Sequence, residues 1–302
     1  RLYKYYRRKD IQKITNTINI SPSEENHKLK EWLEIMPNFD DFMKNSKKKL
    51  KKMVRKGIPD SLRGFIWMKI SGAQKLREGR ELYDELKKGI NENEFIKIPD
   101  EQTIIKDLHR TFPKNVIFNN QLGEGQRQLF RILSCISIRN RRVGYAQGMS
   151  FIVAIFLSYL SEEKSFWMME TLMKNFKLKE ICCIGFPGLK KNLFVLLKLM
   201  HKLLPNLYQK FKKSELYPTI YASSWYLACF TNYLPYEYVI RIFDCYLYEG
   251  PKIIHRISLG LLALKENDFL KKTDKVLELM DGMKTVGENI DFDLLLKKSF
   301  SF

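Results

Sequence analysis

Residues 104–113 read IIKDLHRTFP, and this stretch contains a complete helix end. Its apolar residues fall on one side of a helix, while Asp107 and Arg110 lie three positions apart and can touch on the helix surface. Phe112 precedes Pro113, and a residue before proline avoids the helical conformation. The helix is therefore expected to end just beyond Arg110, so that the guanidinium projects from a helix terminus.

The same helical spacing of apolar side chains recurs along most of the chain. No alternating strand pattern competes with it, and no fixed repeat indicates a solenoid. Glycine and proline separate the periodic segments, as in Gly57-Ile58-Pro59 and Gly250-Pro251. The sequence predicts an all-α globular fold with many medium-length helices. Its clearest apolar stripes are Leu62, Phe65, Ile66 and Ile70; Leu129, Ile132, Leu133 and Ile136; and Leu193, Leu196, Leu197 and Met200.

Length and composition set the organisation. The 302 residues are 45% hydrophobic, enough for a substantial core in one large domain or two tightly packed subdomains. Residues 1–40 are more polar and contain Asn and Ser clusters, which predicts an irregular or partly helical N-terminal extension. The segment after residue 270 is expected to form closing helices.

The chain is strongly basic. Its 53 Lys and Arg against 34 Asp and Glu give a formal net charge of +19, which favours attraction to anionic lipid, nucleic acid or an acidic protein surface. Much of the excess is lysine in runs such as residues 47–52, KKKLKK. Such a run is more often a solvated helix face than a dedicated binding patch.

Cysteine usage and hydropathy indicate the compartment. The five cysteines show no Cys-x-x-Cys spacing, so neither a zinc site nor a disulfide framework is expected. The longest uncharged apolar run, residues 149–160, is shorter than the roughly 18 to 20 residues that span a bilayer, and the basic N-terminus lacks a signal-peptide core. A soluble protein in the reduced cytoplasm is expected.

Residues 144–149 read GYAQGM and form a second informative stretch. Gly144 and Gly148 permit tight backbone turns and close approach of another molecule, just before an apolar helix predicted over residues 149–160. A helix N-terminus there favours a nearby phosphate. Taken alone, the stretch is read more simply, with Gln147 capping the helix and Tyr145 filling the core.

Arg110 and Gln147 suit phosphoryl transfer on a nucleotide held by another molecule. Arginine stays protonated and offers a planar fork of donors for phosphate oxygens, whereas a neutral amide can accept from a water and donate elsewhere. The chain has no Gly-x-x-x-x-Gly-Lys-Ser/Thr loop and no acidic cluster arranged for a metal. An isolated Asp-x-x-Arg would be an ordinary surface ion pair of little energetic value.

A third stretch precedes both. Residues 55–67 read RKGIPDSLRGFIW, in which Gly57 stops one helix, Pro59 lies near the start of the next and Trp67 is expected in the core. Arg63 is interpreted as an internal tether.

These three stretches, in this order, resemble the TBC-domain family of GTPase-activating proteins for Rab GTPases. The similarity continues through residues 127–133, RQLFRIL, residues 224–230, SWYLACF, residues 241–244, RIFD, and Glu249-Gly250, and covers roughly residues 54–264. Phe243 stands where the family usually has tryptophan, an aromatic replacement expected to affect packing more than chemistry.

The resemblance implies an all-α, V-shaped domain of two closely packed helical subdomains, whose groove receives a GTP-bound Rab. Residues 41–180 would form the N-terminal subdomain with both catalytic fingers, and residues 181–302 the C-terminal subdomain with the closing helices. Arg110 matches the arginine finger and Gln147 the glutamine finger. The expected supporting residues are Asp107, Tyr145, Gly148 and Arg63.

The resemblance also implies how the chemistry is divided. The chain would not be a hydrolase by itself and would carry no cofactor or metal of its own, since GTP and magnesium arrive with the Rab. His109, beside Arg110, is expected to line the groove or lie on the surface.

Two other readings stay open. The chain could be a non-catalytic Rab-binding scaffold, against which the intact Arg110 and Gln147 argue. It could also be an adaptor that binds membrane or nucleic acid through charge alone. Peripheral contact with anionic endomembranes is compatible with the Rab reading, whereas a nucleic-acid partner is not expected.

Overall fold

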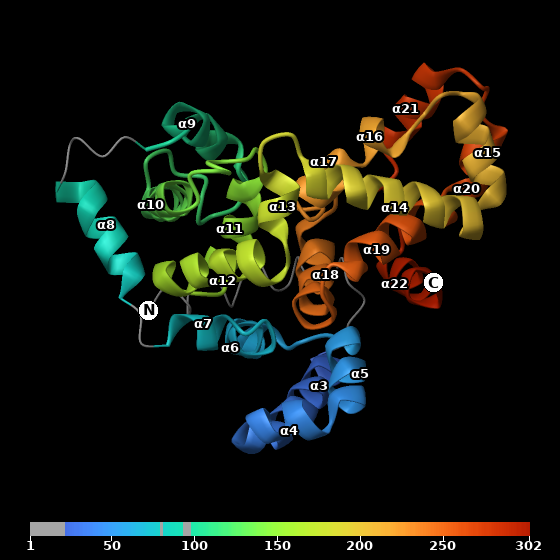
Figure 1. The fold of residues 1–302 in the computed structure, drawn as a ribbon. Coiled ribbons are helices and arrows are strands. Elements are labelled where there is room, and N and C mark those ends of the chain that lie inside the picture. The colour runs from blue at the N-terminus through green and yellow to red at the C-terminus, as the bar shows by residue number, and fades with distance from the viewer. Residues whose placement is uncertain (1–21, 79–80, 93–97) are drawn as a thin grey trace.

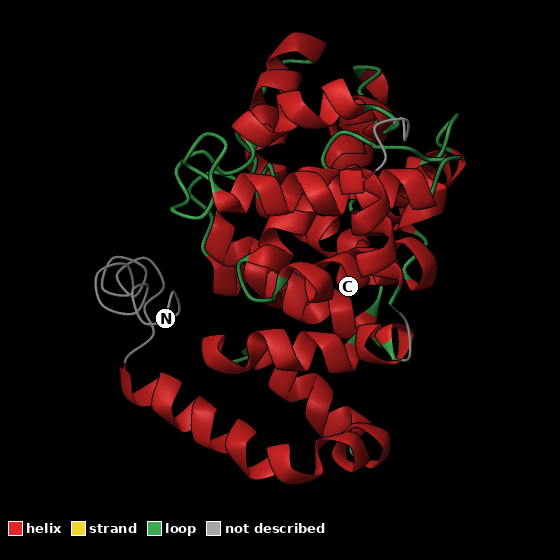
Figure 2. Cartoon of the chain, turned by 90° about the vertical axis from the view of Figure 1, so that its left-hand side faces the viewer, coloured by secondary structure: helices red, strands yellow, loops and turns green. Residues whose placement is uncertain are grey.

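The computed structural model describes residues 22–78, 81–92 and 98–302. Over these ranges the chain forms helices, turns and loops without a strand, as Figure 2 shows, which confirms the all-α prediction. Within the same ranges, no helix combines the length and apolar character needed to cross a membrane.

The first part of the chain wraps the lower and left-hand side of the view in Figure 1 and then enters the core. Helices α10 and α12 both pack against the almost wholly buried α11. The helices of this part are α3 (Pro22–Ile35), η1 (Met36–Asn38), α4 (Phe39–Asn45), α5 (Lys47–Lys56), α6 (Asp60–Ile70), α7 (Ala73–Arg77), α8 (Leu82–Glu92), α9 (Glu101–Arg110), α10 (Glu124–Arg139), α11 (Met149–Leu157), α12 (Glu162–Asn175) and α13 (Leu178–Cys182).

The second part occupies the right-hand side, with α18 running through the middle of the view (Figure 1). Its helices are α14 (Pro187–Leu203), α15 (Pro205–Lys213), α16 (Pro218–Tyr221), α17 (Ser223–Leu227), α18 (Tyr236–Glu249), α19 (Lys252–Leu264), α20 (Glu266–Lys271), α21 (Val276–Lys284) and α22 (Phe292–Ser301). Helix α18 packs against α5 and α6 as well as α19, so it connects the two parts. A subdomain division at residue 180 stays a prediction.

Aromatic side chains fill the junction between α6, α11 and α18. The rings of Trp67, Phe156 and Phe243 are fully buried and lie 5.7 to 6.3 Å apart between centroids. Edge-to-face and tilted aromatic pairs of this kind stabilise a core beyond the area that they bury. Phe243 thus occupies a packing position, as expected from its replacement of tryptophan.

A buried carboxylate satisfies the polar groups of the same junction. Asp244 accepts hydrogen bonds from Trp67 Nε1 at 2.8 Å, from Arg63 Nε at 3.1 Å and from the Ile58 backbone N–H at 3.3 Å. One turn earlier on α18, Arg241 donates to the final carbonyls of α5. Together they fix the turn at residues 57–59, where Gly57 has φ = 122°.

The structure corrects two expectations. Phe65 was placed in a core stripe, but 47% of its surface is exposed and its ring lies edge-on to Phe39. Helix α11 ends at Leu157, whereas the apolar run predicted a helix through residue 160. Just after it the Tyr159 N–H bonds to the Phe156 carbonyl, three residues back, which is a tighter turn than that of an α-helix.

The expected N-terminal extension is only partly described. Residues 22–40 are mostly helical, and Trp32 is buried with its indole N–H donating to the Gly57 carbonyl at 3.1 Å. This segment therefore packs on the turn before α6. Residues 1–21 of the expected extension lie outside the described ranges.

Candidate functional site

Arg110 is the last residue of α9, and half of its side chain is exposed. Its Nη2 pairs with Oδ1 of Asp107, whose side chain is buried. Arginine stays protonated at physiological pH. The buried carboxylate pairs with one guanidinium nitrogen, and the other N–H donors of the guanidinium remain free for a partner. The end of α9 thus presents a guanidinium whose position is held by its ion pair with Asp107.

Contacts just after Arg110 fix the direction of the chain. Thr111 Oγ1 donates to the Asp107 carbonyl at 2.6 Å and lies 2.8 Å from Ser150 Oγ at the start of α11. The Phe112 ring packs edge-on against Phe151 and Tyr236, at 5.3 and 5.5 Å between centroids. The exit from α9 is therefore attached to both α11 and α18.

Gln147 lies on a loop whose backbone conformation favours glycine at two positions, 144 and 148. Gly144 and Gly148 have φ values of 63° and 105°, and a Cβ on Gly144 would fall 2.3 Å from the Asp100 carboxylate. That carboxylate accepts the Tyr145 backbone N–H at 3.0 Å. The Gln147 side chain is exposed and α11 has no side-chain cap, so the structure does not support the reading of Gln147 as a helix cap.

One carboxylate joins the two loops. Oδ2 of Asp107 accepts a hydrogen bond from the Tyr145 hydroxyl at 2.5 Å, while Oδ1 pairs with Arg110. Burial raises the pKa of Tyr145, and the bond to Asp107 raises it further, so the phenol remains a donor at physiological pH. Tyr145 is two residues from Gln147, so the arginine and glutamine segments share a single anchor.

The remaining supporting candidate lies elsewhere. Arg63 is buried, and its partners are Asp244, the Ile58 carbonyl, Asp60 and Tyr159, none of which belongs to either loop. Burial opposes its charge, but the neighbouring Asp244 raises its pKa above the ordinary value. Arg63 is thus the internal tether that the sequence predicted, and the structure does not bring it to Asp107.

Sequence reasoning missed five exposed apolar side chains on the α13–α14 turn, on α14, and at and just before α16. We call these residues the apolar surface: Ile184, Phe186, Phe194, Tyr217 and Ile220. Ile184 is 88% exposed and Phe194 is 58% exposed, so neither belongs to the core. The sequence signal for Ile184 and Phe186 was their place beside Gly185 and Pro187, at a turn where a core residue is not required.

The apolar surface is connected to the glutamine loop through α16 and α17. Gly148 packs so closely on Ala228, just after α17, that an added Cβ would lie 3.0 Å from the Ala228 Cβ. In Figure 1 the turn before α14 and helix α16 lie along the same upper edge of the molecule as α9. Large exposed apolar side chains on elements that pack together, as α14 and α16 do, are typical of a protein interface.

Unpaired cations accompany the two loops. The side chains of Lys106, Lys114, Arg141 and Arg142 are exposed, and none has an acidic partner in the described part of the chain. His109 is also exposed beside Arg110. A partner with negative charge would be attracted to this edge.

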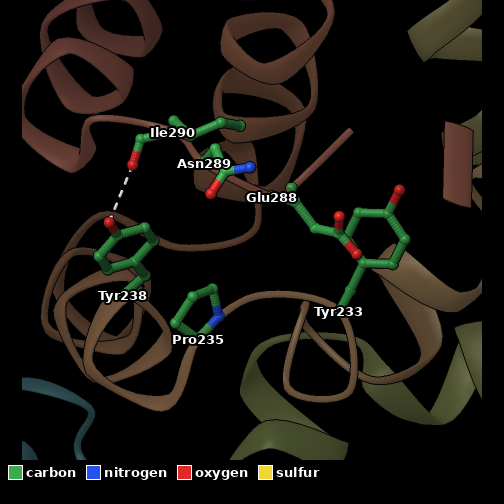
Figure 3. Close-up of a pocket in the computed structure, with 7 residues that line it drawn as sticks. Tyr233, Pro235, Tyr238, Glu288, Asn289 and Ile290 are labelled. Carbon is green, nitrogen blue, oxygen red and sulfur yellow. Dashed lines mark hydrogen bonds between the residues drawn. The ribbon is translucent and has the colours of Figure 1, made fainter. Parts of the chain in front are cut away.

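A separate pocket of about 530 Å³ lies between the start of α18 and the loop before α22 (Figure 3). The Tyr238 hydroxyl already donates to the Ile290 carbonyl at 2.8 Å, and the Tyr233 hydroxyl to the Met283 carbonyl. Its lining offers one carboxylate and no basic side chain. The lining residues are Tyr233, Pro235, Tyr238, Gly287, Glu288, Asn289 and Ile290.

Metal chemistry finds no support in the side-chain arrangement. Across the ranges that the structure describes, no three His, Cys, Asp or Glu side chains are grouped so that they could hold a metal ion. The cysteines are all unpaired thiols. The candidate site consists of Arg110, Gln147 and the Asp107 carboxylate that both of their segments contact.

Comparison with known proteins gives one consistent result. A model of the Rab-GTPase-TBC domain matches residues 60–270. The ecotropic viral integration site 5 protein homolog of Homo sapiens is 30% identical over 240 residues, which cover 80% of this chain and 29% of that protein. Growth hormone-regulated TBC protein 1 of Xenopus tropicalis is 33% identical over 260 residues, covering 83% of this chain and 74% of that protein.

A solved structure agrees in fold. The Chlamydomonas flagellar RabGAP TBC domain superimposes with a TM-score of 0.74 and 29% identity, over 93% of this chain and 96% of that one. The first three curated relatives are longer than this chain, which spans between 26% and 51% of their lengths.

Proposed function

Because the chain belongs to the Rab-GTPase-TBC domain family, we propose that it accelerates GTP hydrolysis by a Rab-family small GTPase. The observation that carries this proposal is the shared anchor at Asp107. This buried carboxylate forms an ion pair with Arg110. It also accepts a hydrogen bond from Tyr145, which lies on the same loop as Gln147. A charged fork and a neutral amide are thereby offered to solvent from neighbouring segments.

The two exposed groups have separate roles in the proposed reaction. Arg110 neutralises negative charge that develops on the transferred phosphoryl group, as arginine fingers do in trans. Gln147 orients the attacking water and contacts the phosphate loop of the GTPase, because an amide is too weakly basic to remove a proton but has donors and acceptors for positioning. The glutamine of the Rab itself would then be dispensable.

The partner supplies what this chain does not. GTP and its magnesium ion arrive bound to the GTPase, which docks in its GTP-loaded form. The apolar surface and the unpaired cations beside the finger loops supply contact area and charge for that docking. The chain would act in the cytoplasm, in peripheral contact with endomembranes.

A non-catalytic Rab-binding scaffold is the alternative function. A scaffold needs the docking surface but has no use for an exposed arginine fixed on a buried carboxylate. The presence of both Arg110 and Gln147 at the solvent-facing ends of their segments favours catalysis.

Hydrolysis by a panel of GTP-loaded Rabs, with and without the purified chain, tests the proposal. Stimulation of at least one Rab is expected, and Arg110→Ala should reduce it by about 10³-fold or more. Arg110→Lys should be nearly as inactive because lysine lacks the planar fork, and Gln147→Ala should also lose most stimulation. Arg77→Ala, which removes a partly exposed arginine on α7 that pairs with Glu163 and belongs to neither segment, is the control. Stimulation that survives Arg110→Ala, or binding without stimulation across the panel, contradicts catalysis by the fingers.

A further inference from the structure

Helix α5 carries an exceptional concentration of positive charge. Seven of its ten residues are Lys or Arg, and none is acidic. Two of the seven pair with a buried carboxylate, since Arg55 and Lys51 reach Glu249 at 2.6 and 3.1 Å. A third, Lys49, lies over the Phe42 ring at 5.7 Å from its centroid. Burial alone would raise the pKa of Glu249, but the hydrogen bonds from Arg55 and Lys51 lower it, so this carboxylate is ionised and fully engaged.

Three other lysines of α5 form an outward stripe. Lys48, Lys52 and Lys56 are spaced four residues apart, all are exposed, and none has an ion-pair partner among the described residues. Residues four apart in a helix rise about 6 Å and lie on the same side, so three like charges stand in a row. Like charges at this spacing destabilise a helix by about 0.2 to 0.5 kcal/mol per pair. The fold gains nothing from the stripe.

The stripe adjoins a second basic element. The Arg55 guanidinium lies 3.9 Å from the centroid of the Phe300 ring, which brings the end of α22 beside α5. Lys297 and Lys298 on α22 are exposed and have no acidic partner in the part of the chain that the structure describes. Leu294, three and four residues before them, is 50% exposed on the same helix.

This surface lies away from the finger loops. In Figure 1, α5 is at the lower end of the molecule and α9 is at the upper end. A ligand on α5 would therefore leave Arg110 and Gln147 open to a docked GTPase. Binding of a ligand at α5 would therefore not block docking of a GTPase at α9.

We propose that Lys48, Lys52, Lys56, Lys297 and Lys298, here called the lysine face, bind an anionic lipid bilayer. Clustered lysines are attracted to a negatively charged leaflet without needing a fixed geometry, and each contributes about 1 kcal/mol near the surface, or roughly fivefold in binding. Leu294 provides an apolar side chain that can enter the interfacial layer. Nucleic-acid recognition instead favours free arginine forks and stacked aromatic rings, whereas the one arginine of α5, Arg55, is held by Glu249 and the Phe300 ring.

Vesicle sedimentation of the full chain tests the proposal, with phosphatidylcholine vesicles that contain or lack roughly 30 mol% phosphatidylserine, at about 0.1 M salt. We expect binding to the anionic vesicles only. The triple variant Lys48→Gln, Lys52→Gln, Lys56→Gln should bind on the order of 100-fold more weakly. The variant Lys190→Gln, Lys191→Gln, Lys198→Gln removes three exposed lysines from α14 and should bind nearly as the parent does.

Undiminished vesicle binding by the α5 variant would overturn the proposal, and so would an equal loss of vesicle binding in the α14 variant. A soluble DNA duplex that displaces the chain completely from anionic vesicles, at a concentration below that of the vesicle lipid, would overturn it as well. An unchanged thermal melt of the α5 variant excludes unfolding as the cause of lost binding. GTPase stimulation in solution, without vesicles, should be equal in the parent and the α5 variant. The lysine face and the proposed catalytic function can therefore fail independently.

Discussion

The Tyr145 hydroxyl donates a 2.5 Å hydrogen bond to the carboxylate of Asp107, 38 residues earlier in the chain. The same carboxylate pairs with Arg110, so the arginine segment and the glutamine loop are held in one arrangement before any partner binds. Preorganisation of this kind removes an ordering cost from the reaction that follows.

Tyr145→Phe should lower the maximal rate of stimulated GTP hydrolysis about tenfold, the effect of losing one hydrogen bond to a charged group. The ring stays in the core, but the buried Asp107 oxygen loses a donor, so the free energy of unfolding should fall by about 1 to 3 kcal/mol while KM for the GTPase should rise little. Saturation kinetics separate the two parameters. Tyr238→Phe removes a hydroxyl hydrogen bond at the pocket of Figure 3 and serves as control. Equal rates for the two variants would show that the Tyr145–Asp107 bond does not position the fingers.

Replacement of Ile184 or Phe194 by serine should raise KM for the GTPase about tenfold or more and leave kcat near the parent value. Exposed anchors at a protein interface contribute to association, whereas the fingers act on the reacting phosphate. Leu33→Ser is the matched control, since Leu33 is 50% exposed on α3, at the far end of the molecule in Figure 1. A loss of kcat at unchanged KM would contradict a docking role.

Asp244→Asn should lower the free energy of unfolding by about 3 to 5 kcal/mol, because Arg63 would keep a buried charge without its buried counter-charge, with only the exposed Asp60 left as an acidic partner. Chemical denaturation measures the change. Asp40→Asn breaks the exposed pair with Lys69 and should cost less than about 1 kcal/mol. Similar losses in the free energy of unfolding for the two substitutions would mean that burial does not increase the contribution of the Arg63–Asp244 pair to stability.

His255 should make the fold less stable in mild acid. Burial lowers its pKa from 6.5 to about 4, and its ring nitrogens lie 2.7 Å from Tyr226 Oη and 3.0 Å from Asn192 Oδ1. The unfolded chain therefore takes up a proton at a higher pH than the folded chain does. The free energy of unfolding contributed by this group is fully present above about pH 6.5 and is lost as pH falls toward about 4.

Unfolding titrations of the parent and of His255→Gln between these two pH values test this contribution. Glutamine keeps polar atoms at the site but does not titrate, so the variant should show a shallower dependence on pH. Parallel curves for the two proteins would assign the pH dependence to other groups.

Local features of the site could be predicted from sequence because they depend on neighbouring residues. Proline after Phe112 predicted the helix end at Arg110, and the two glycines around Gln147 predicted turns that the structure contains. The pairing of Asp107 with Arg110 follows from their spacing on one helix. Such relationships depend on backbone conformation over a few residues.

Relationships between distant segments could not be predicted in the same way. Its own stretch predicted Tyr145 in the core and the family resemblance made it a supporting residue, but its bond to Asp107 depends on how α9 packs beside the loop before α11. Phe65 fits an apolar helical stripe but faces outward, since periodicity does not show which positions a neighbouring helix covers. For the same reason the apolar surface was missed.

The shared carboxylate also has an evolutionary consequence. A codon change at Asp107 would disturb the arginine and the glutamine segments together, although neither finger codon had altered. A descendant gene could thus keep both signature residues and still encode a protein with little activity. A comparison of related sequences that considers only positions 110 and 147 would therefore classify such a protein as active.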